Sequence, residues 1–595
     1  MRTFLLILML GALFAGAPAV AQEPPQVRFQ IVSDDSDFQD LIVSASLVSA
    51  IRRDNSNAAQ DYISAAQADY NRILAALYQE GYYGAVISIQ LDGREAAEIA
   101  PLGAPDQVRV IVLRIDPGPR FRFGQTRISP LASDTDLPPE FARGQRARTT
   151  AIRDAAQASV EAWRNAGHAK AEPGGQSIVA RHDERLLDVD IGMDPGPQLR
   201  FGSLIIQGNE RVRTERIREI AALPGREVYS PQELAQVAER LRRTGTFRIV
   251  TLTEADEPNP DGTLDITAQV SEQKRRRLGY GIEAEADEGL ALSAFWLHRN
   301  LLGGAERLRI DGEISGIGSD TDLDYRLGAR FTRPAFRNPD MELYLEAELE
   351  QLNEPDFSTR QFQVGAGVNR YLRPNLQYSV GVAILGSRVE DDLGTRDQLF
   401  LLFPFDGEYD LRNDRFNPTA GSYVSAQITP YIGAQEGGTG GRLYGDGRIY
   451  RALGDTTVFA FRGQIGSILG SDAESTPAEF LFYSGGGGTV RGQGFQSLAV
   501  ELGGGDRIGG RSFLGGAFEL RQGITDQISL VGFYDVGYIG ADSFPGDEGD
   551  WHSGAGLGLR YETGIGPIRL DIGVPVSGPE AESDFQVYIG IGQAF

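Results

Sequence analysis

The feature that most constrains this chain is a change, from about Gly279 onward, to apolar and polar residues that alternate at every second position. In residues 342–349 and 568–574, for example, leucine, isoleucine, alanine or valine occupies every second position. A soluble sandwich can alternate in this way, but so can the strands of a membrane barrel, which have lipid on one face and water on the other. In a membrane such a sheet must close, because an open edge leaves amide groups unpaired in hydrocarbon. The alternation therefore predicts an all-β transmembrane barrel over residues 276–595.

Length and composition agree with a barrel of this size. Residues 276–595 are 320 in number, so 16 antiparallel strands would take about 20 residues each with their turns. A tilted membrane strand uses ~9–11 of those residues, and barrels of roughly 14 or 18 strands also fit. The chain has 74 glycines, 29 phenylalanines and 21 tyrosines, as expected for tight turns and aromatic girdles.

The first residues have the pattern of a secretory signal peptide. A basic start at Arg2 precedes the apolar run Phe4–Gly16, and a small-x-small site ends at Ala21. Cleavage there would make Gln22 the first residue of the mature chain. A membrane-spanning helix is the alternative, which the shortness of the run and Pro18 disfavour. The chain has no cysteine, so we expect neither disulfides nor a lipid anchor attached through cysteine.

Residues 22–275 repeat themselves. The segment that begins Asp-Pro-Gly-Pro at Asp116 recurs 78 residues later at Asp194, and a glycine that ends a helix recurs at the same offset. A glycine in left-handed conformation is what a helix C-terminus favours. We expect three α+β units, each with a small sheet and helices: residues 22–117, 118–195 and 196–275.

No pattern of enzyme chemistry stands out. The four histidines are scattered without partners at ligand spacing, which argues against a metal or acid–base site. The glycine run 485–488 is followed by neither Lys-Ser nor Lys-Thr, so it is not a phosphate-binding loop. We expect no catalytic residues, no cofactor and no metal. The net charge of −25 argues against nucleic acid as a partner.

Two segments of the barrel half predict a structural site. Residues 484–498 form a glycine-rich loop that presents Arg491, and residues 533–537 are a strand with Asp535 as its one acidic residue. If both lie inside the barrel, they can form an ion pair that holds the loop in the lumen. Gly537 lies on the same strand face as Asp535 and would leave room for the loop. Alternatively, Arg491 lines an aqueous pore.

The three N-terminal units, placed after a signal peptide and ahead of a glycine-rich barrel, resemble POTRA domains. The barrel stretches similar to the superfamily of POTRA-bearing outer-membrane assembly factors are Trp296–Gly303, Tyr409–Thr419, Val490–Gly492 and Phe533–Gly537. The resemblance covers the chain from about residue 26 to its end, and it rests on the order and spacing of these motifs. It implies a barrel in the outer membrane of a Gram-negative bacterium and repeats in the periplasm. It also implies that the loop tip with Val490, Arg491 and Gly492 folds into the lumen.

Three POTRA units on about 600 residues resemble, within the superfamily, the TamA family of the translocation and assembly module. That resemblance implies aid to the insertion of autotransporter-type clients and a TamB-like partner anchored in the inner membrane. One departure is Gln493, which stands where the superfamily usually has an aromatic residue, and Phe495 is the nearest substitute. The alternatives are a polypeptide-secretion pore of the two-partner type and a lipid-transport component.

The seam between the first and last barrel strands is the second predicted site. Gly279 and Gly281 on the first strand would face Gly590 and Gly592 on the last, and glycine weakens strand pairing. Such a seam could open sideways as a lateral gate and template a client strand; alternatively, the glycines only relieve crowding. The last strand is predicted to run to Phe595, which resembles the C-terminal signal of outer-membrane proteins.

One basic run is predicted to meet the membrane surface. Lys274–Arg277 joins the last repeat to the barrel. It would contact the headgroups of membrane lipids, or it would only keep the junction solvated.

Overall fold

The computed structural model describes residues 24–53, 58–100, 105, 107–285, 289–319, 322–503, 505–564, 566–578 and 585–595. The predicted signal peptide, with its cleavage site between Ala21 and Gln22, lies outside the described residues. The chain forms two compact units, the first made mainly of residues up to Gly202 and the second mainly of residues from Ser203 onward. None of the described helices is long and apolar enough to cross a membrane.

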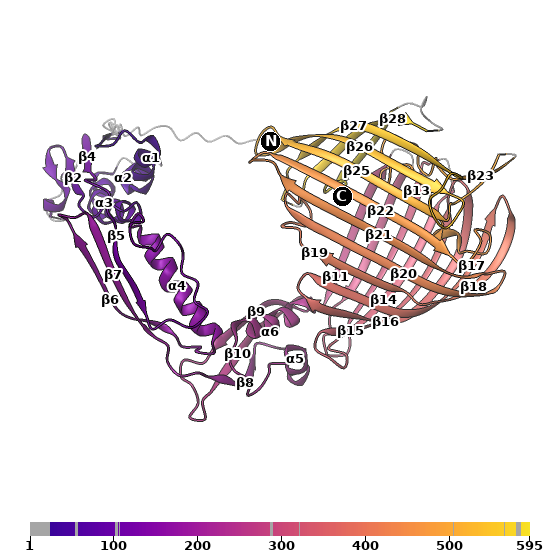
Figure 1. The fold of residues 1–595 in the computed structure, drawn as a ribbon, viewed down its shortest axis with the longest axis horizontal. Helices are drawn as coiled ribbons and strands as arrows, with labels where there is room; N and C mark the ends of the chain where they lie inside the picture. Colours follow the sequence, from indigo (N-terminus) through magenta and orange to yellow (C-terminus); the bar gives the residue numbers. More distant parts are fainter. Residues whose placement is uncertain are drawn as a thin grey trace, which may run out of the picture. The chain divides into compact units, whose positions relative to one another are not determined.

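In the described residues, the first unit contains two small sheets, the first with three α-helices and the second with one (Figure 1). One has the order β1-β4-β2-β3 and the other the order β5-β7-β6. Their elements are β1 Gln26–Ile31, α1 Ser36–Ala45, α2 Leu47–Arg53, α3 Ala59–Gln79, β2 Val86–Leu91, β3 Arg94–Glu95, β4 Val110–Asp116, β5 Arg122–Ser129, α4 Thr149–Asn165, β6 Glu172–Arg181 and β7 Leu186–Asp194.

A third small sheet, β8-β10-β9, follows with two helices. Its elements are β8 Arg200–Gln207, α5 Thr214–Ala221, α6 Pro231–Arg243, β9 Phe247–Glu254 and β10 Thr263–Glu272. The glycines that follow helices α3, α4 and α6, Gly81, Gly167 and Gly245, all have positive φ, at 77°, 96° and 64°. Each therefore has the left-handed backbone that allows the chain to leave its helix.

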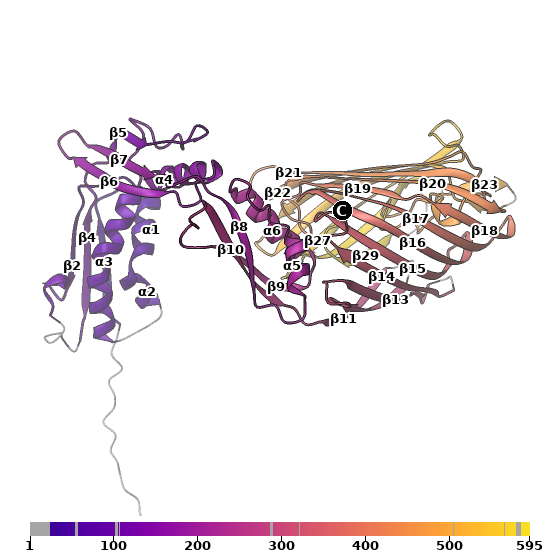
Figure 2. The same cartoon turned by 90° about the horizontal axis from the view of Figure 1, so that it is seen from below.

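The second unit is dominated by a closed antiparallel barrel whose strands run obliquely around it (Figures 1 and 2). Its strands are β11 Arg276–Glu285, β12 Gly289–His298, β13 Arg307–Ile317, β14 Asp324–Pro334, β15 Met341–Asn353, β16 Phe357–Arg373, β17 Leu376–Asp391, β18 Gly394–Leu402, β19 Phe405–Asp410, β20 Gly421–Gln435, β21 Thr439–Ala452, β22 Thr457–Leu469, β25 Ser512–Gly523, β26 Ile528–Gly540, β27 Gly549–Tyr561, β28 Ile568–Ser577 and β29 Gln586–Ile591.

One barrel strand is interrupted. β18 and β19 both lie between β17 and β20, on either side of Phe403 and Pro404. Proline cannot donate a hydrogen bond to a neighbouring strand, which accounts for a break at this point. With β18 and β19 taken as one strand, the described residues form 16 barrel strands.

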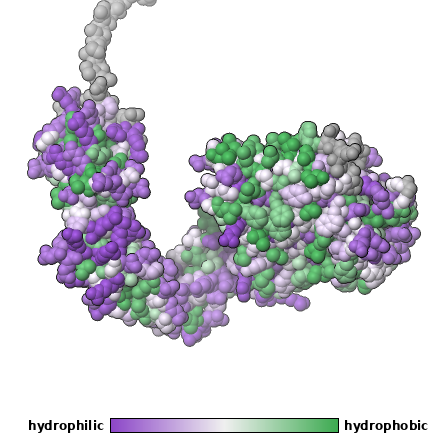
Figure 3. Space-filling view, turned by 45° about the horizontal axis from the view of Figure 1, so that its top comes forward, coloured by the Kyte–Doolittle hydropathy of each residue, from purple (hydrophilic) through white to green (hydrophobic). Residues whose placement is uncertain are grey.

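The alternation seen in the sequence separates the two faces of the barrel wall. In β28, Ile568, Leu570, Ile572 and Val574 are exposed on the outside, whereas Asp571 between them is fully buried on the inside. Hydrophobic side chains accordingly cover much of the barrel surface in Figure 3. The outer face is suited to lipid and the inner face to a polar interior.

Within the second unit, α6 is fixed to the turn between β14 and β15. Arg240 donates two hydrogen bonds to Asp340, of 3.0 and 2.9 Å, and Arg243 donates a third of 3.2 Å. Arg243 also lies over the ring of Tyr371, 4.0 Å from its centroid. Burial raises the pKa of Asp340, but the two arginines outweigh it and leave the pKa below its usual value.

Asp340→Asn should loosen α6. Because the pKa of Asp340 is lowered in the folded state, its stabilisation is present at neutral pH and is lost as the pH falls through that lowered value. Losing the charge at pH 7 should cost about 1–3 kcal/mol locally, seen as faster hydrogen–deuterium exchange in α6. Asp256→Asn, at an exposed aspartate of the same unit, is the control. Equal exchange in both variants would contradict this role for Asp340.

Candidate functional site

A loop between β22 and β25 enters the barrel interior. Its base is closed by two backbone hydrogen bonds between Ser484 and Leu498, of 3.1 and 2.9 Å. Beyond this base, four consecutive tip residues, Val490–Gln493, are buried. We call residues 484–498 the lumen loop and residues 490–493 its tip.

The tip is fixed by Arg491, whose side chain is 2% exposed. Arg491 Nε and Nη2 donate to the two oxygens of Asp535 on β26, at 2.7 and 2.9 Å. The backbone N–H of Arg491 donates to the same carboxylate at 3.1 Å, and the guanidinium lies 3.8 Å from the ring centroid of Phe533. The structure thus brings Arg491 and Asp535 into a bidentate, buried pair, the strong form of charge-assisted hydrogen bond.

Arg491 also meets two carboxylates that the sequence analysis did not single out. Its Nη1 donates to Glu519 on β25 at 2.7 Å and to Asp571 on β28 at 3.2 Å. Glu519 accepts a further bond of 2.8 Å from Arg521, and Asp571 pairs with Arg560 on β27. We call these six residues, with three positive and three negative charges, the lumen charge network.

The network has little contact with solvent, and none of its six residues is more than 5% exposed. Charges buried to this degree are costly unless each is paired and hydrogen-bonded. The equal number of arginines and carboxylates satisfies that condition. Removing one member leaves an unpaired buried charge, so the loop and four consecutive strands depend on one another.

Glycines on the barrel wall make room for the tip. A Cβ atom added to Gly537 would lie 2.9 Å from Val490 Cγ2 and 2.3 Å from Ser484 Oγ. One added to Gly554 on β27 would lie 2.0 Å from the carbonyl oxygen of Arg491. Gly492 has φ of +94°, and a Cβ there would meet the backbone of β28. The backbones of tip and wall can approach this closely only because side chains are missing on both sides.

Position 493 is well packed although its residue is a glutamine and not an aromatic one. Gln493 is fully buried, and its Nε2 donates to Ser553 O at 2.7 Å and to Ser577 O at 2.9 Å, on β27 and β28. The pairing of β27 with β28 shifts register beside Ser553, and the glutamine amide satisfies carbonyls at that irregularity. Phe495 is only half-buried and packs near Gly486 at the loop base, so it does not take the tip position.

The seam between the first and last strands is almost unpaired. β11 pairs with β12 along its whole length, from Arg276 to Glu285. Among the described residues, β11 pairs with β29 only at Glu285 and Tyr588. The edge of β11 from Arg276 to Ala284 therefore has no strand partner within the described chain.

The seam differs from the sequence prediction in two ways. Gly279 and Gly281 do not lie opposite Gly590 and Gly592; they are covered from β12, where a Cβ at Gly279 would lie 2.2 Å from the ring of Phe295. Phe595 is not part of the seam either. β29 ends at Ile591, Gly592 turns the chain with φ of +96°, and Phe595 is buried inside the barrel.

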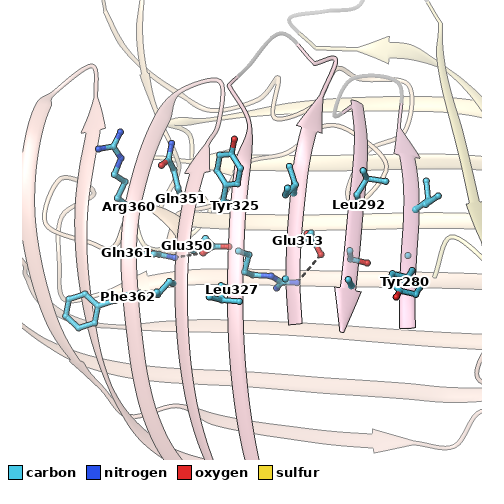
Figure 4. Close-up of a pocket in the computed structure, with 18 residues that line it drawn as sticks. Tyr280, Leu292, Glu313, Tyr325, Leu327, Glu350, Gln351, Arg360, Gln361 and Phe362 are labelled. Carbon is cyan, nitrogen blue, oxygen red and sulfur yellow. Dashed lines mark hydrogen bonds and ion pairs between the residues drawn. The ribbon is translucent and has the colours of Figure 1, made fainter. Parts of the chain in front are cut away.

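A groove of about 1080 Å³ adjoins the unpaired edge, on strands β11 to β16. Figure 4 shows Tyr280, Leu292, Leu327 and Phe362 spread across these strands. Tyr280 and Ile282 on β11 are 81% and 77% exposed. Exposed apolar side chains beside unpaired backbone groups are what an added amphipathic strand can bind.

Comparison with known families agrees with this architecture. Residues 300–595 match the Omp85 superfamily domain, and residues 199–273 match a POTRA family described as surface antigen variable number repeat. The chain is an Omp85-superfamily protein with a POTRA domain. The Omp85 superfamily consists of β-barrel proteins of the outer membrane. The apolar outer face of this barrel agrees with that location.

Solved structures share the fold of this Omp85 protein at low identity. BamA from Haemophilus ducreyi lacking POTRA domains 1–3 is 17% identical, with a TM-score of 0.61, over 79% of this chain and 100% of that one. CdiB from Acinetobacter baumannii is 14% identical, with a TM-score of 0.50, over 79% and 89%. Such identities establish a shared fold and not a shared activity.

The four network residues beyond Arg491 and Asp535 had a sequence signal. Glu519, Arg521, Arg560 and Asp571 each stand at an inward position of a strand, beside at least one exposed apolar residue. Charged residues at inward positions of the strands around β26 mark the network. The three-dimensional pairing, however, depends on strand register, which the alternation alone does not give.

The charge network predicts a coupled loss of stability. Arg491→Ala should lower the free energy of unfolding by about 3–5 kcal/mol, because it strands buried carboxylates. The double variant Arg491→Ala/Asp535→Ala should lose less than the sum of the single variants. The loss of stability in each variant is measured as the temperature at which its heat-modifiable gel band moves to the position of the unfolded chain.

Arg448→Gln is the control for that cycle. Arg448 also points inward, but its partner Asp446 keeps a second arginine, Arg462, at 2.7 Å. Its loss should cost much less than that of Arg491. If the stability loss of the double variant equals the sum of the losses of the two single variants, Arg491 and Asp535 are not energetically coupled.

Proposed function

We propose that this Omp85 protein is a TamA-like assembly factor that helps unfolded outer-membrane clients to insert at its seam. The observation that carries the proposal is the edge of β11, which is unpaired from Arg276 to Ala284 beside a closed barrel. An unpaired strand edge is a template on which another strand can form hydrogen bonds. Clients of the autotransporter type, which insert as β-strands, fit this chemistry.

The exposed side chains of β11 support the same role. Leu278, Tyr280 and Ile282 all lie on the outer face and are exposed. A client strand that alternates apolar and polar residues would place its apolar side chains in the same layer, against lipid. Backbone hydrogen bonds would provide affinity without requiring a particular client sequence, which suits a factor that serves several clients.

The lumen loop would keep the barrel intact while the seam works. Its tip is bound to β25, β26, β27 and β28 through the lumen charge network and through Gln493. These are the strands that lead up to the seam on the side of β29. Bracing them from inside would allow β11 and β29 to separate while the neighbouring strands stay paired.

The N-terminal units are proposed as three POTRA domains that receive a TamB-like partner anchored in the inner membrane. In the sheet β5-β7-β6, β6 is an edge strand and is exposed along most of its length. Such an edge suits binding of an extended segment through backbone groups. Lys274 and Arg275–Arg277 are exposed where the chain enters β11, and they are proposed to contact anionic lipid headgroups.

Secretion through the lumen is the weaker candidate. A polypeptide passing through the barrel would have to displace the tip of the lumen loop. That step would break the buried contacts of Arg491 with Asp535, Glu519 and Asp571. Because unpairing buried charges is costly, insertion at the seam requires less rearrangement than passage through the centre.

A disulfide across the seam tests the proposal. The pair Glu285–Tyr588 sets the register, so Ile282 and Ile591 would be opposite each other if pairing continued. The variant Ile282→Cys/Ile591→Cys should lose client assembly when oxidised and regain it when reduced, because the edge of β11 is then closed. The chain has no native cysteine, so the single-cysteine variants are clean controls. Full client assembly by the oxidised form would refute insertion at the seam.

The loop has its own functional test. Arg491→Ala should leave the barrel inserted in the outer membrane while reducing client assembly, because the tip no longer braces β25–β28. The assay compares client insertion per inserted barrel, with Arg448→Gln as the matched loss of an inward arginine. Unchanged client insertion would count against the bracing role.

A further inference from the structure

The last four residues, 592–595, form what we call the C-terminal tail, which leaves the barrel wall and enters the lumen. Gly592 has φ of +96°, a conformation that ends the extended strand, and its N–H donates to Pro567 O at 2.7 Å. Phe595 is 6% exposed and packs in a cluster with Tyr450, Ala460 and Ala517. The tail is therefore held inside the barrel by side chains of β21, β22 and β25.

Three side-chain hydrogen bonds hold the tail as well. Arg521 Nη2 donates to the backbone carbonyl of Phe595 at 3.2 Å. Arg560 Nε donates to Gln593 Oε1 at 3.0 Å, and Gln593 Nε2 in turn donates to Asn417 Oδ1 at 2.9 Å. Arg521, Arg560 and Phe595 are buried, and bonds from a charged donor are strong in such surroundings.

The two arginines that hold the tail are members of the lumen charge network. Arg521 pairs with Glu519 at 2.8 Å, and Arg560 pairs with Asp571. Those two carboxylates are also partners of Arg491 at the loop tip. A continuous chain of ion pairs, completed by two hydrogen bonds, therefore runs from the lumen loop through two carboxylates and two arginines to the tail.

The tail has a second place that it could occupy. Continued from the pair Glu285–Tyr588, an extended tail would put Gly592 opposite Gly281 and Gln593 opposite Tyr280. It would then cover residues 278–281 of the edge of β11 that is now unpaired. Because the tail cannot lie in the lumen and on the edge together, whatever retains it in the lumen keeps that edge free.

We propose that Arg521 and Arg560 are positioning residues that retain the C-terminal tail in the lumen and so keep the edge of β11 open. Both act through the tail and touch no client. Through Glu519 and Asp571 they also link the state of the tail to the docking of the lumen loop. This inference rests on the proposed function only in assigning the free edge to clients.

Two disulfide reporters on the full-length chain read the position of the tail without any client. Ala517→Cys/Ala594→Cys joins residues of one interior cluster, so it forms readily when the tail is in the lumen. Ile282→Cys/Ile591→Cys forms when β29 pairs with β11 as far as Ile591, the residue before the tail, which the tail can follow onto the edge. The rate of each disulfide, under a mild oxidant and measured by mass spectrometry, gives the balance between the two positions.

Removal of the retaining contacts should move the tail. Arg521→Gln combined with Gln593→Ala should raise the rate of the seam disulfide about a hundredfold and lower that of the interior disulfide, since each of the two lost bonds to a charged donor is worth about tenfold in an equilibrium. Gln593→Ala alone should give a smaller change of the same sign. It leaves every pair of the charge network in place, so its heat-modifiable migration should match that of the parent.

Arg448→Gln is again the matched control, because Arg448 points inward and pairs with Asp446 without contacting the tail. It should leave both disulfide rates unchanged. If both disulfides form at the parent's rates in the Arg521 and Gln593 variants, the inference is overturned, whether or not client assembly changes. If the rates change as expected but the oxidised seam variant still assembles clients, the retention of the tail stands and the proposed function fails.

Discussion

The lumen charge network is the interaction on which the rest of the site depends. A buried guanidinium that meets three carboxylates would be unfavourable alone, because its partners would carry excess negative charge. Arg521 and Arg560 restore the balance, and each reaches a different carboxylate. The result is a neutral cluster that spans four consecutive strands and fixes the loop tip. Its electrostatics explain why the loop occupies the lumen, and its geometry explains why the tip faces β26.

Missing side chains are as important as the charges. Gly537 and Gly554 on the wall, with Gly492 on the tip, allow backbones to approach to distances that any Cβ would prevent. At the seam glycine has another use, since the ring of Phe295 covers Gly279. The same residue type thus admits a loop at one place and accommodates a neighbouring ring at another. Glycine content alone does not distinguish these two uses.

Much of this architecture is readable from the sequence because its periods are simple. The alternation in residues 568–574 gives the outward and inward faces of β28 correctly, and the pair Arg491–Asp535 could be expected once the family resemblance placed the loop in the lumen. The seam was less readable, since a one-residue turn at Gly592 decides whether Phe595 lies on the wall or inside. That turn is a backbone conformation which glycine permits but does not require. Gln493 was likewise understood only once the two carbonyls that it satisfies could be seen.

The unpaired edge of β11 has an energetic consequence for a barrel in lipid. In an antiparallel ladder, alternate residues direct their N–H and C=O groups toward a given neighbour, so the stretch from Arg276 to Ala284 leaves roughly four or five residues with unpaired groups. Each such group costs about 1–3 kcal/mol when it is kept from water. A client strand that pairs with this edge recovers that free energy, whatever its sequence. The barrel therefore keeps part of its own folding incomplete, and under the proposed function this part would provide the driving force for binding a strand from another chain.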